Sequence, residues 1–416
     1  MSIPDAVAPV PPSPPARGRF IAFRSRDFRL LLAGQAVSLT GSQMQQVAVV
    51  WQLYQLTRSP LSLGMLGLFR IVPILVFALG GGVVADALDR RRMMLVTQTL
   101  LALVSVALTV LAHAGQTTPA AIYGLAFVAG AATAFDNPAR QALVPRLVDR
   151  AQLPNALSLY ATVWQVATIA GPALGGALLA WTGATAIYVL DVVSFGAVIA
   201  ALLAMEHRHV GLGASQISAR AALDGLRFIR RTPLIWSTML LDFAATFFAG
   251  SMLLLPIFAD QLLRVGTQGL GLLYSAQPVG AAIAGAALST FHPPRRRGQA
   301  VLWAVAIYGA AITVFGLSPW FWLSFAMLAL SGAADTVSMV IRQTLRQTLT
   351  PDELRGRMSS VNMIFFMGGP QLGEVEAGVL ARLAGVRVSV ASGGLLCAIT
   401  AAAVAALVPA LRRYEE

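Results

Sequence analysis

Twelve apolar runs, each long enough to cross a lipid bilayer, constrain this chain more than any other feature of its sequence. A spanning helix needs about 20 mostly apolar residues. The runs lie near 30–56, 62–85, 93–113, 119–141, 156–181, 185–205, 233–259, 269–291, 299–317, 320–341, 358–383 and 387–410. We therefore predict an all-α integral membrane protein with twelve transmembrane helices, in contact with the lipid bilayer.

Composition agrees with this prediction. The chain is 57% hydrophobic and 12% charged, against about 25% charged residues in a soluble domain. Its 30 basic residues are all arginine, and they form short clusters between the apolar runs instead of one stripe. We interpret them as residues that orient the helices, and we expect no nucleic-acid partner.

The arginines divide unequally between the two sides of the predicted bundle. With the N-terminus placed in the cytoplasm, 25 arginines lie on the cytoplasmic side. The other side carries Arg58, Arg264, Arg382 and Arg387, and Arg70 lies within a span. This division follows the positive-inside rule and predicts that both termini are cytoplasmic.

The polar segments outside the runs suggest five regions. Residues 1–19 are rich in proline and predict a disordered cytoplasmic tail. Residues 206–232 predict a cytoplasmic linker with an amphipathic helix on the inner leaflet. The linker joins six-helix bundles at 20–205 and 233–410, and 411–416 forms a short cytoplasmic tail.

The two halves of the sequence repeat each other. At an offset of 205, Gly64, Leu68, Pro73, Gly80 and Arg90–Arg92 match Gly269, Leu273, Pro278, Gly285 and Arg295–Arg297. At an offset of 202, Arg140, Gln141, Gly171 and Gly176 match Arg342, Gln343, Gly373 and Gly378. Two six-helix halves in parallel orientation resemble the major facilitator fold, which places the substrate between pseudo-symmetric bundles.

The loop after the second run, GVVADALDRRR at 82–92, resembles the loop signature of the major facilitator superfamily. Gly82, Asp86, Arg90 and Arg91 occupy its glycine, aspartate and basic positions. The resemblance implies that these residues belong to a cytoplasmic gate. The alternative is that the arginines only set the topology.

Within this gate, Asp86 is expected to face the start of the eleventh helix, near Met358–Ser360. A carboxylate there is stabilised by the exposed amides of the helix N-terminus. Arg90 is expected to pair with Asp136, which ends the fourth run on the same side. Helix capping or pairing with Arg140 is the alternative role for Asp136.

Residues 171–176, GPALGG, resemble the signature of proton-coupled antiporters in the same superfamily. Gly171, Gly175 and Gly176 allow helix backbones to approach closely, and Pro172 removes a hydrogen bond and bends the helix. The residues by themselves indicate helix packing. The resemblance is what implies export.

Residues 136–148, 341–362 and 371–380 resemble the enterobactin-exporter branch of drug and siderophore efflux carriers, which includes macrolide pumps. This resemblance implies a monomeric secondary transporter of the bacterial inner membrane. Such a protein exports small amphipathic molecules by alternating access in exchange for protons. An ion-coupled importer of a small nutrient and a non-transporting membrane receptor are the alternatives.

Ionisable residues within spans are costly and point to function. Here they are Arg70, Asp136, Asp191, Asp242, Asp335, Glu374 and Glu376. Asp242 is a candidate proton or substrate site, with a structural role as the alternative, and Asp191 is expected to make structural hydrogen bonds. Arg70 and Glu374 lie at matching depths and are predicted to interact across the two halves. The alternative is that Arg70 only snorkels or holds a carbonyl.

Other function classes lack their sequence signals. The loops are too short for the active site of a membrane enzyme, and no Gly-Lys-Ser/Thr loop for nucleotide binding exists. The single cysteine, Cys397, excludes a disulfide framework. His207 and His209 have no third ligand nearby, so we predict neither a metal site nor a cofactor.

Overall fold

The computed structural model describes residues 21–87, 89–206, 230, 232–250, 252–290 and 296–414, with side chains in 78–87, 352–357 and 359–367 excepted. The predicted tail at 1–19 and nearly all of the predicted linker lie outside this description. The first half contains η1 (Ile21–Arg24), α1 (Arg26–Thr57), α2 (Pro60–Ala87), α3 (Arg90–His113), α4 (Pro119–Leu143), η2 (Val144–Arg146) and α5 (Leu153–Ala204).

The second half contains α7 (Pro233–Phe248), η3 (Met252–Leu254), α8 (Leu255–Ile257), the π-helix η4 (Phe258–Leu262), α9 (Gly266–Thr290), α10 (Arg297–Leu317), α11 (Phe321–Leu349), α12 (Asp352–Ala384), α13 (Val386–Leu407) and α14 (Pro409–Arg412). Its seventh span is therefore a chain of α, 3-10 and π segments. The described residues contain helices and no strand.

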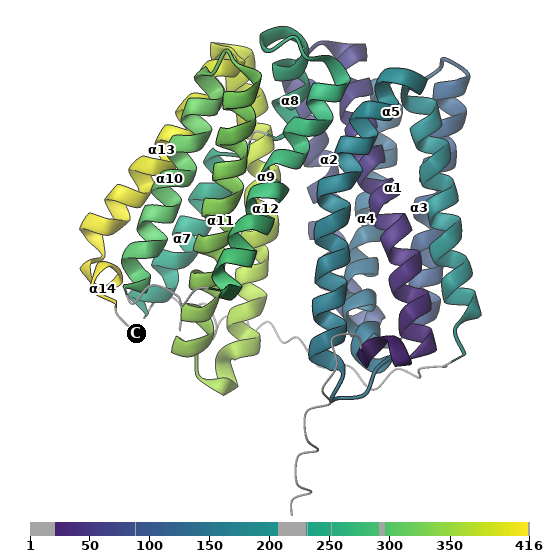
Figure 1. Cartoon of the computed structure of the whole chain (residues 1–416), viewed down its shortest axis with the longest axis horizontal. Coiled ribbons are helices and arrows are strands. Elements are labelled where there is room, and N and C mark those ends of the chain that lie inside the picture. Colours follow the sequence, from purple (N-terminus) through teal and green to yellow (C-terminus); the bar gives the residue numbers. More distant parts are fainter. Residues whose placement is uncertain are drawn as a thin grey trace, which may run out of the picture.

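The helices account for twelve passes across a bilayer. Nine helical segments of the described chain are long and apolar enough to span, and α5, with 52 residues, is long enough to do so twice. At Gly183 the backbone leaves the helical region (φ 76°, ψ −179°), a conformation that glycine adopts without strain. Gly183 thus separates the fifth and sixth spans. The ribbon of α5 reverses direction within its length (Figure 1).

The remaining two spans are α1 and α12, with 32 and 33 residues. At 1.5 Å per residue each exceeds the roughly 30 Å hydrocarbon core. Both contain polar side chains, such as Gln45 in α1 and Glu374 in α12, which lower their mean hydropathy below that of the other spans. The predicted all-α fold with twelve transmembrane helices is confirmed.

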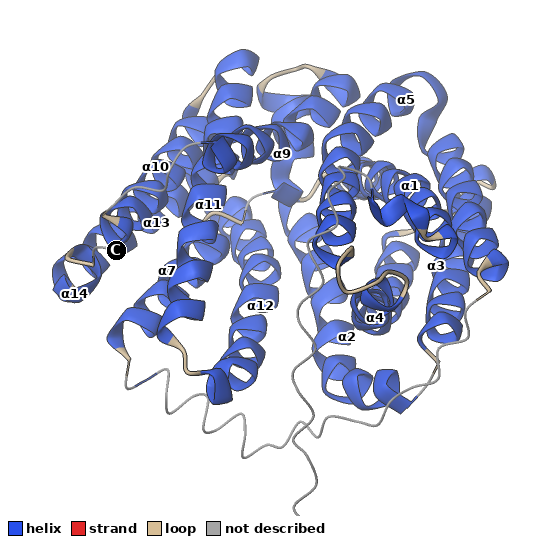
Figure 2. Ribbon diagram, turned by 60° about the horizontal axis from the view of Figure 1, so that its bottom comes forward, coloured by secondary structure: helices blue, strands red, loops and turns tan. Residues whose placement is uncertain are grey.

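The helices form two bundles that are joined through α5 with α9 and α2 with α12. α1 packs on α5, and α4 on α2 and α3, in the first half; α10 packs on α13 and α11, and α12 on α7, in the second. Figure 2, turned from the view of Figure 1 so that its bottom comes forward, shows the two groups next to each other. Across the halves, α5 contacts α9, α2 contacts α12 and η3, and α1 contacts α8.

Pairs of glycines join the halves at two places related by the sequence repeat. A Cβ on Gly176 of α5 would lie 2.6 Å from the Cα of Gly271 in α9. A Cβ on Gly378 of α12 would lie 2.9 Å from the Cα of Gly64 in α2. These distances leave no room for a side chain, so glycine permits the backbones to touch.

Both glycine contacts lie a few residues from the helix ends next to Gly183, which we call the Gly183 end of the molecule. The opposite, arginine-rich end carries Arg90–Arg92, Arg296 and Arg412. The ribbons of the two halves approach each other at the Gly183 end and lie farther apart below it (Figure 1). The halves therefore meet at the Gly183 end, and the contact between α5 and α9 continues toward the middle of the bundle, where Gln165 donates to the Pro278 carbonyl.

Candidate functional site

Two adjoining cavities occupy the middle of the first half and reach the interface between the halves. Their volumes are about 260 and 340 Å³. Both are lined by Ser42, Gln45, Gln46, Val104, Ala129 and Thr133, and we call them together the first-half cavity. α1 supplies most of the uncharged polar side chains of its wall, and Gln371 of α12 contributes from the second half.

Charge in the first-half cavity is of one sign. Arg70 lines one end and Arg140 the other, and its described lining residues include no Asp or Glu. Amide, hydroxyl and guanidinium groups can donate hydrogen bonds to a ligand, and the guanidinium groups also favour negative charge. This lining suits a neutral or anionic molecule with many hydrogen-bonding groups.

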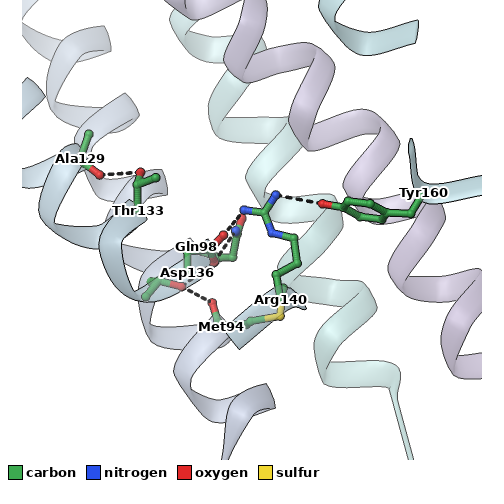
Figure 3. A network of polar contacts seen from close by, with 8 residues as sticks. Met94, Gln98, Ala129, Thr133, Asp136, Arg140 and Tyr160 are labelled. Atoms are coloured by element: carbon green, nitrogen blue, oxygen red, sulfur yellow. Dashed lines mark hydrogen bonds and ion pairs between the residues drawn. The ribbon is translucent and has the colours of Figure 1, made fainter. Parts of the chain in front are cut away.

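Arg140 belongs to a buried polar network that joins α3, α4 and α5 (Figure 3). Asp136 is fully buried and forms an ion pair with Arg140 one turn further along α4. Its Oδ1 accepts hydrogen bonds from Thr97 Oγ1 at 2.7 Å and Gln98 Nε2 at 2.9 Å. Arg140 also donates to the hydroxyl of Tyr160 at 3.1 Å. The network fixes the orientation of Arg140 beside the cavity.

The predicted gate loop lies at the arginine-rich end. Gly82 and Asp86 fall in the part of α2 whose side chains are outside the described residues. Arg90 donates to a carbonyl at the end of α4 at 3.4 Å, and Arg91 donates to two carbonyls at the end of α5 at 2.6 and 2.9 Å. The prediction that Arg90 pairs with Asp136 is corrected, because Asp136 has its ion pair within α4.

The predicted antiporter-like motif divides between two neighbours. A Cβ on Gly171 would lie 2.5 Å from Gln43, and one on Gly175 would lie 2.9 Å from the backbone of Met44, both in α1. Pro172 and Gly176 instead face α9, since a Cβ on Gly271 of α9 would lie 2.5 Å from the Pro172 carbonyl. The motif therefore packs α5 both within its own half and against the other half.

Asp242 has charged neighbours that its position in the sequence does not reveal. Arg342 Nη2 of α11 lies 2.8 Å from Asp242 Oδ1, and Arg346 Nη1 lies 3.6 Å from Oδ2. Arg342 is 1% exposed and also lies 3.6 Å from Asp335, which lines a third cavity of about 260 Å³ between α5, α9 and α11. Arg342 thus joins Asp335 and Asp242 in one cluster of charged side chains.

Arg70 and Glu374 face each other across the contact between α2 and α12. The Glu374 carboxylate lies against the α2 backbone, since a Cβ on Gly67 would be 2.6 Å from its Oε2. Gly67 and Arg70 are three residues apart and share one face of α2. Glu374 and Arg70 therefore lie within about one helical turn of each other on adjoining helices. Their interaction across the two halves stays a prediction.

A second polar network closes the Gly183 end between the halves. Asp260 of η4 accepts hydrogen bonds from the Tyr54 hydroxyl at 2.6 Å and from Arg58 Nη1 at 2.5 Å. Gln261 donates to the Tyr54 hydroxyl at 3.0 Å, and the Arg58 guanidinium lies 4.7 Å from the centre of the Tyr54 ring. The hydrogen bond to Tyr54 raises the pKa of Arg58. We call these four residues the Tyr54 network.

Comparison with known families agrees with this architecture. The family described as "Transmembrane secretion effector", a branch of the major facilitator superfamily, matches residues 17–416. The chain belongs to this family. It is a membrane transporter and not an enzyme, as its sequence predicts.

Relatives of this secretion effector include the enterobactin exporter EntS of Shigella boydii serotype 18 and that of Escherichia coli O1:K1. Each is 26% identical over 389 residues, which cover 94% of this chain and 93% of the relative. The predicted resemblance to the enterobactin-exporter branch is confirmed. The coverage shows that the similarity includes both halves.

Solved structures support the fold. A bacterial homologue of the human lysosomal transporter Spinster, inward-facing and unoccupied, has a TM-score of 0.70 at 13% identity and covers 94% of this chain and 99% of its own. An inward-facing bacterial homologue of ferroportin has a TM-score of 0.71 at 17% identity, with coverages of 91% and 98%. At these identities the likeness establishes the major facilitator fold alone.

Sequence reasoning missed two features of this transporter. The Tyr54 network escaped it because Tyr54 and Asp260 are 206 residues apart, and neither is unusual at the end of a span. The polar wall of the cavity had a signal, since Ser38, Ser42, Gln45 and Gln46 gather in one span. These side chains are polar but uncharged, so a search for charged residues within the spans does not find them.

The Tyr54 network leads to a prediction about how the halves separate. Replacing Asp260 with asparagine is expected to open the Gly183 end roughly two- to fivefold more often, because a partly exposed ion pair contributes modestly. Spin labels on Gln116→Cys and Trp320→Cys, in connections of different halves at this end, measure the separation. An Asp149→Asn variant at the other end is the control and should leave the distances unchanged. An unchanged distance distribution in Asp260→Asn would show that the Tyr54 network does not hold the Gly183 end closed.

Proposed function

We propose that this protein exports a small, hydrogen-bonding amphipathic molecule from the bacterial cytoplasm across the inner membrane, by alternating access in exchange for protons. The observation that carries the proposal is the first-half cavity, a polar space inside a spanning bundle that reaches the contact between the halves. A buried polar cavity at the interface of two repeats is the usual substrate site of such a fold.

The orientation follows from charge. The arginine-rich end is assigned to the cytoplasm by the positive-inside rule, which places both termini there. The Gly183 end then faces the outside, and the Tyr54 network and the glycine contacts close it. The arrangement corresponds to a carrier open to the cytoplasm, able to load a substrate there. Because one chain supplies both halves of the path, the transporter is proposed to act as a monomer.

The substrate class is narrowed by the lining of the cavity. The described wall offers Arg70, Arg140, amides and hydroxyls and no carboxylate, so it suits a ligand with hydrogen-bond acceptors better than a cation. The relatives are named for export of enterobactin. A siderophore-like molecule with many oxygen atoms is therefore favoured over a lipophilic cation.

The cytoplasmic gate is part of the proposal. Gly82, Asp86, Arg90, Arg91 and Asp136 are assigned to it, with Asp86 meeting the start of α12 when the cytoplasmic side closes. The hydrogen bonds of Arg90 and Arg91 to carbonyls of α4 and α5 tie the loop to its own half. That anchorage lets the loop move together with the first half as one body.

The test uses purified protein in liposomes with the arginine-rich end in a known orientation. Movement of enterobactin and of the cationic dye ethidium is measured with and without a pH gradient. We expect gradient-driven transport of enterobactin away from the arginine-rich end and little transport of ethidium. Transport in the opposite direction supports the nutrient importer, and absence of movement or exchange for any probe supports a receptor.

A further inference from the structure

Asp191 is the most enclosed carboxylate that the transport scheme above does not use. It lies in the second part of α5, eight residues or about 12 Å beyond Gly183, and its exposed fraction is 0%. Oδ2 accepts a hydrogen bond from Ser105 of α3 at 2.7 Å. Oδ1 accepts from Ser194 at 3.2 Å and from Ser42 of α1 at 3.4 Å.

No cation balances this carboxylate in the described part of the chain. α1, α3 and α5 surround it with serine hydroxyls, whereas Asp136 and Asp242 each contact an arginine. The titratable side chain nearest along α5 is Tyr188, whose hydroxyl donates to Gln52 at 2.7 Å. The charged groups that line the adjoining cavity are Arg70 and Arg140. Burial of a carboxylate without an ion pair favours its neutral form.

The hydroxyls around Asp191 can satisfy both protonation states. Ser105 Oγ lies 2.7 Å from the carboxylate and 3.1 Å from the carbonyl of Leu101. Ser194 Oγ lies 3.2 Å from the carboxylate and 2.8 Å from the Asp191 carbonyl. Each hydroxyl hydrogen can therefore point to the ionised carboxylate or turn to the backbone when Asp191 carries a proton. Proton gain requires only rotation of these hydroxyls.

A short route connects Asp191 with the cavity. Ser42 lines the first-half cavity and also donates to Asp191. Gln45 lines the same cavity, and its Nε2 donates to Ser105 Oγ at 2.7 Å. Gly41 lets α1 lie this close, because a Cβ there would be 2.9 Å from Asp191 Oδ1. The carboxylate is thus one hydroxyl away from the space assigned to the substrate.

We propose that Asp191 is the proton-binding site that couples export to the pH gradient, an inference that rests on the proposed function. Loading breaks an O–H bond of a hydronium ion in the cavity and forms an O–H bond on Asp191, by way of Ser42. Release reverses these two changes. No other co-reactant is required.

The same contacts give the coupling its sign. A substrate hydroxyl that donates to Gln45 Oε1 continues a chain in which Gln45 donates to Ser105 and Ser105 donates to Asp191. All hydrogens in this chain point toward the carboxylate, and hydrogen bonds aligned in this way strengthen one another. The chain therefore stabilises the ionised form of Asp191. Substrate binding therefore expels the proton, which is the order that exchange of substrate for protons requires.

The experiment first measures the proton site without any substrate. Infrared difference spectra of the wild-type protein in liposomes during acidification should show the carbonyl band of protonated carboxylic acids. One component of that band should be lost in Asp191→Asn and kept in Asp149→Asn, an exposed cytoplasmic-side control. An identical band in Asp191→Asn overturns the proposal. If Asp191→Asn does not fold, Ser105→Ala is used instead, and its carboxyl titration should move to higher pH.

Coupling is then measured with enterobactin. In weak buffer, wild-type protein should release protons when enterobactin binds, and Asp191→Asn should release none while still exchanging enterobactin without a gradient. Full gradient-driven accumulation by Asp191→Asn overturns the inference but leaves the proposed export intact. An Asp191-dependent infrared band in a protein that moves no probe upholds the proton site and refutes the export function.

Discussion

Replacing Arg342 with alanine is expected to destabilise the second half of the transporter by about 3–5 kcal/mol, the cost of leaving a buried charge without its partner. Arg342 is 1% exposed and holds Asp242 at 2.8 Å and Asp335 at 3.6 Å. Its removal takes the nearer of two arginines from Asp242, and the remaining one, Arg346, lies 3.6 Å away. The measurement is thermal unfolding of the purified variant in detergent.

Two further variants give this prediction its controls. Arg382→Ala, at an exposed position near the end of α12, should change stability by less than about 0.5 kcal/mol. Replacing Arg342 with methionine and Asp242 with leucine together removes the pair as a whole and should recover most of the loss. Wild-type stability in Arg342→Ala would show that the cluster is solvated and would favour Asp242 as a site of proton exchange.

Neutralising either Arg70 or Glu374 is expected to reduce export at least roughly tenfold, because each leaves the other charge unbalanced in the membrane. Glu374 lies against Gly67 of α2, one turn from Arg70, at the contact between the halves. We propose that their attraction favours the state in which the Gly183 end is closed. The rate of enterobactin transport into liposomes measures the loss.

A charge swap separates this interaction from two independent roles. Arg70→Glu combined with Glu374→Arg should regain part of the transport that each single variant loses. Glu376→Gln is the matched control, because residue 376 points about 200° away around α12. If the swap is no better than the single variants, the attraction between the two groups is not what transport requires.

Local patterns in the sequence were enough for the fold. Apolar runs of about 20 residues specify spanning helices because lipid cannot satisfy a free backbone, and the repeat of Gly64, Gly176 and Arg140 in the second half specifies two related bundles. The Asp136–Arg140 pair could also be predicted from the sequence, since residues four apart on a helix are neighbours.

The partners of the other polar residues were decided by tertiary structure. Asp242 and Arg342 are 100 residues apart in sequence, and Tyr54 and Asp260 are 206 apart. The hydrogen-bond partners of Asp191 come from α1, α3 and α5. Helical periodicity states which residues share a face, but the rotation and crossing of each helix determine which faces meet. Those are set by close packing over the whole bundle, and no single segment of sequence contains them.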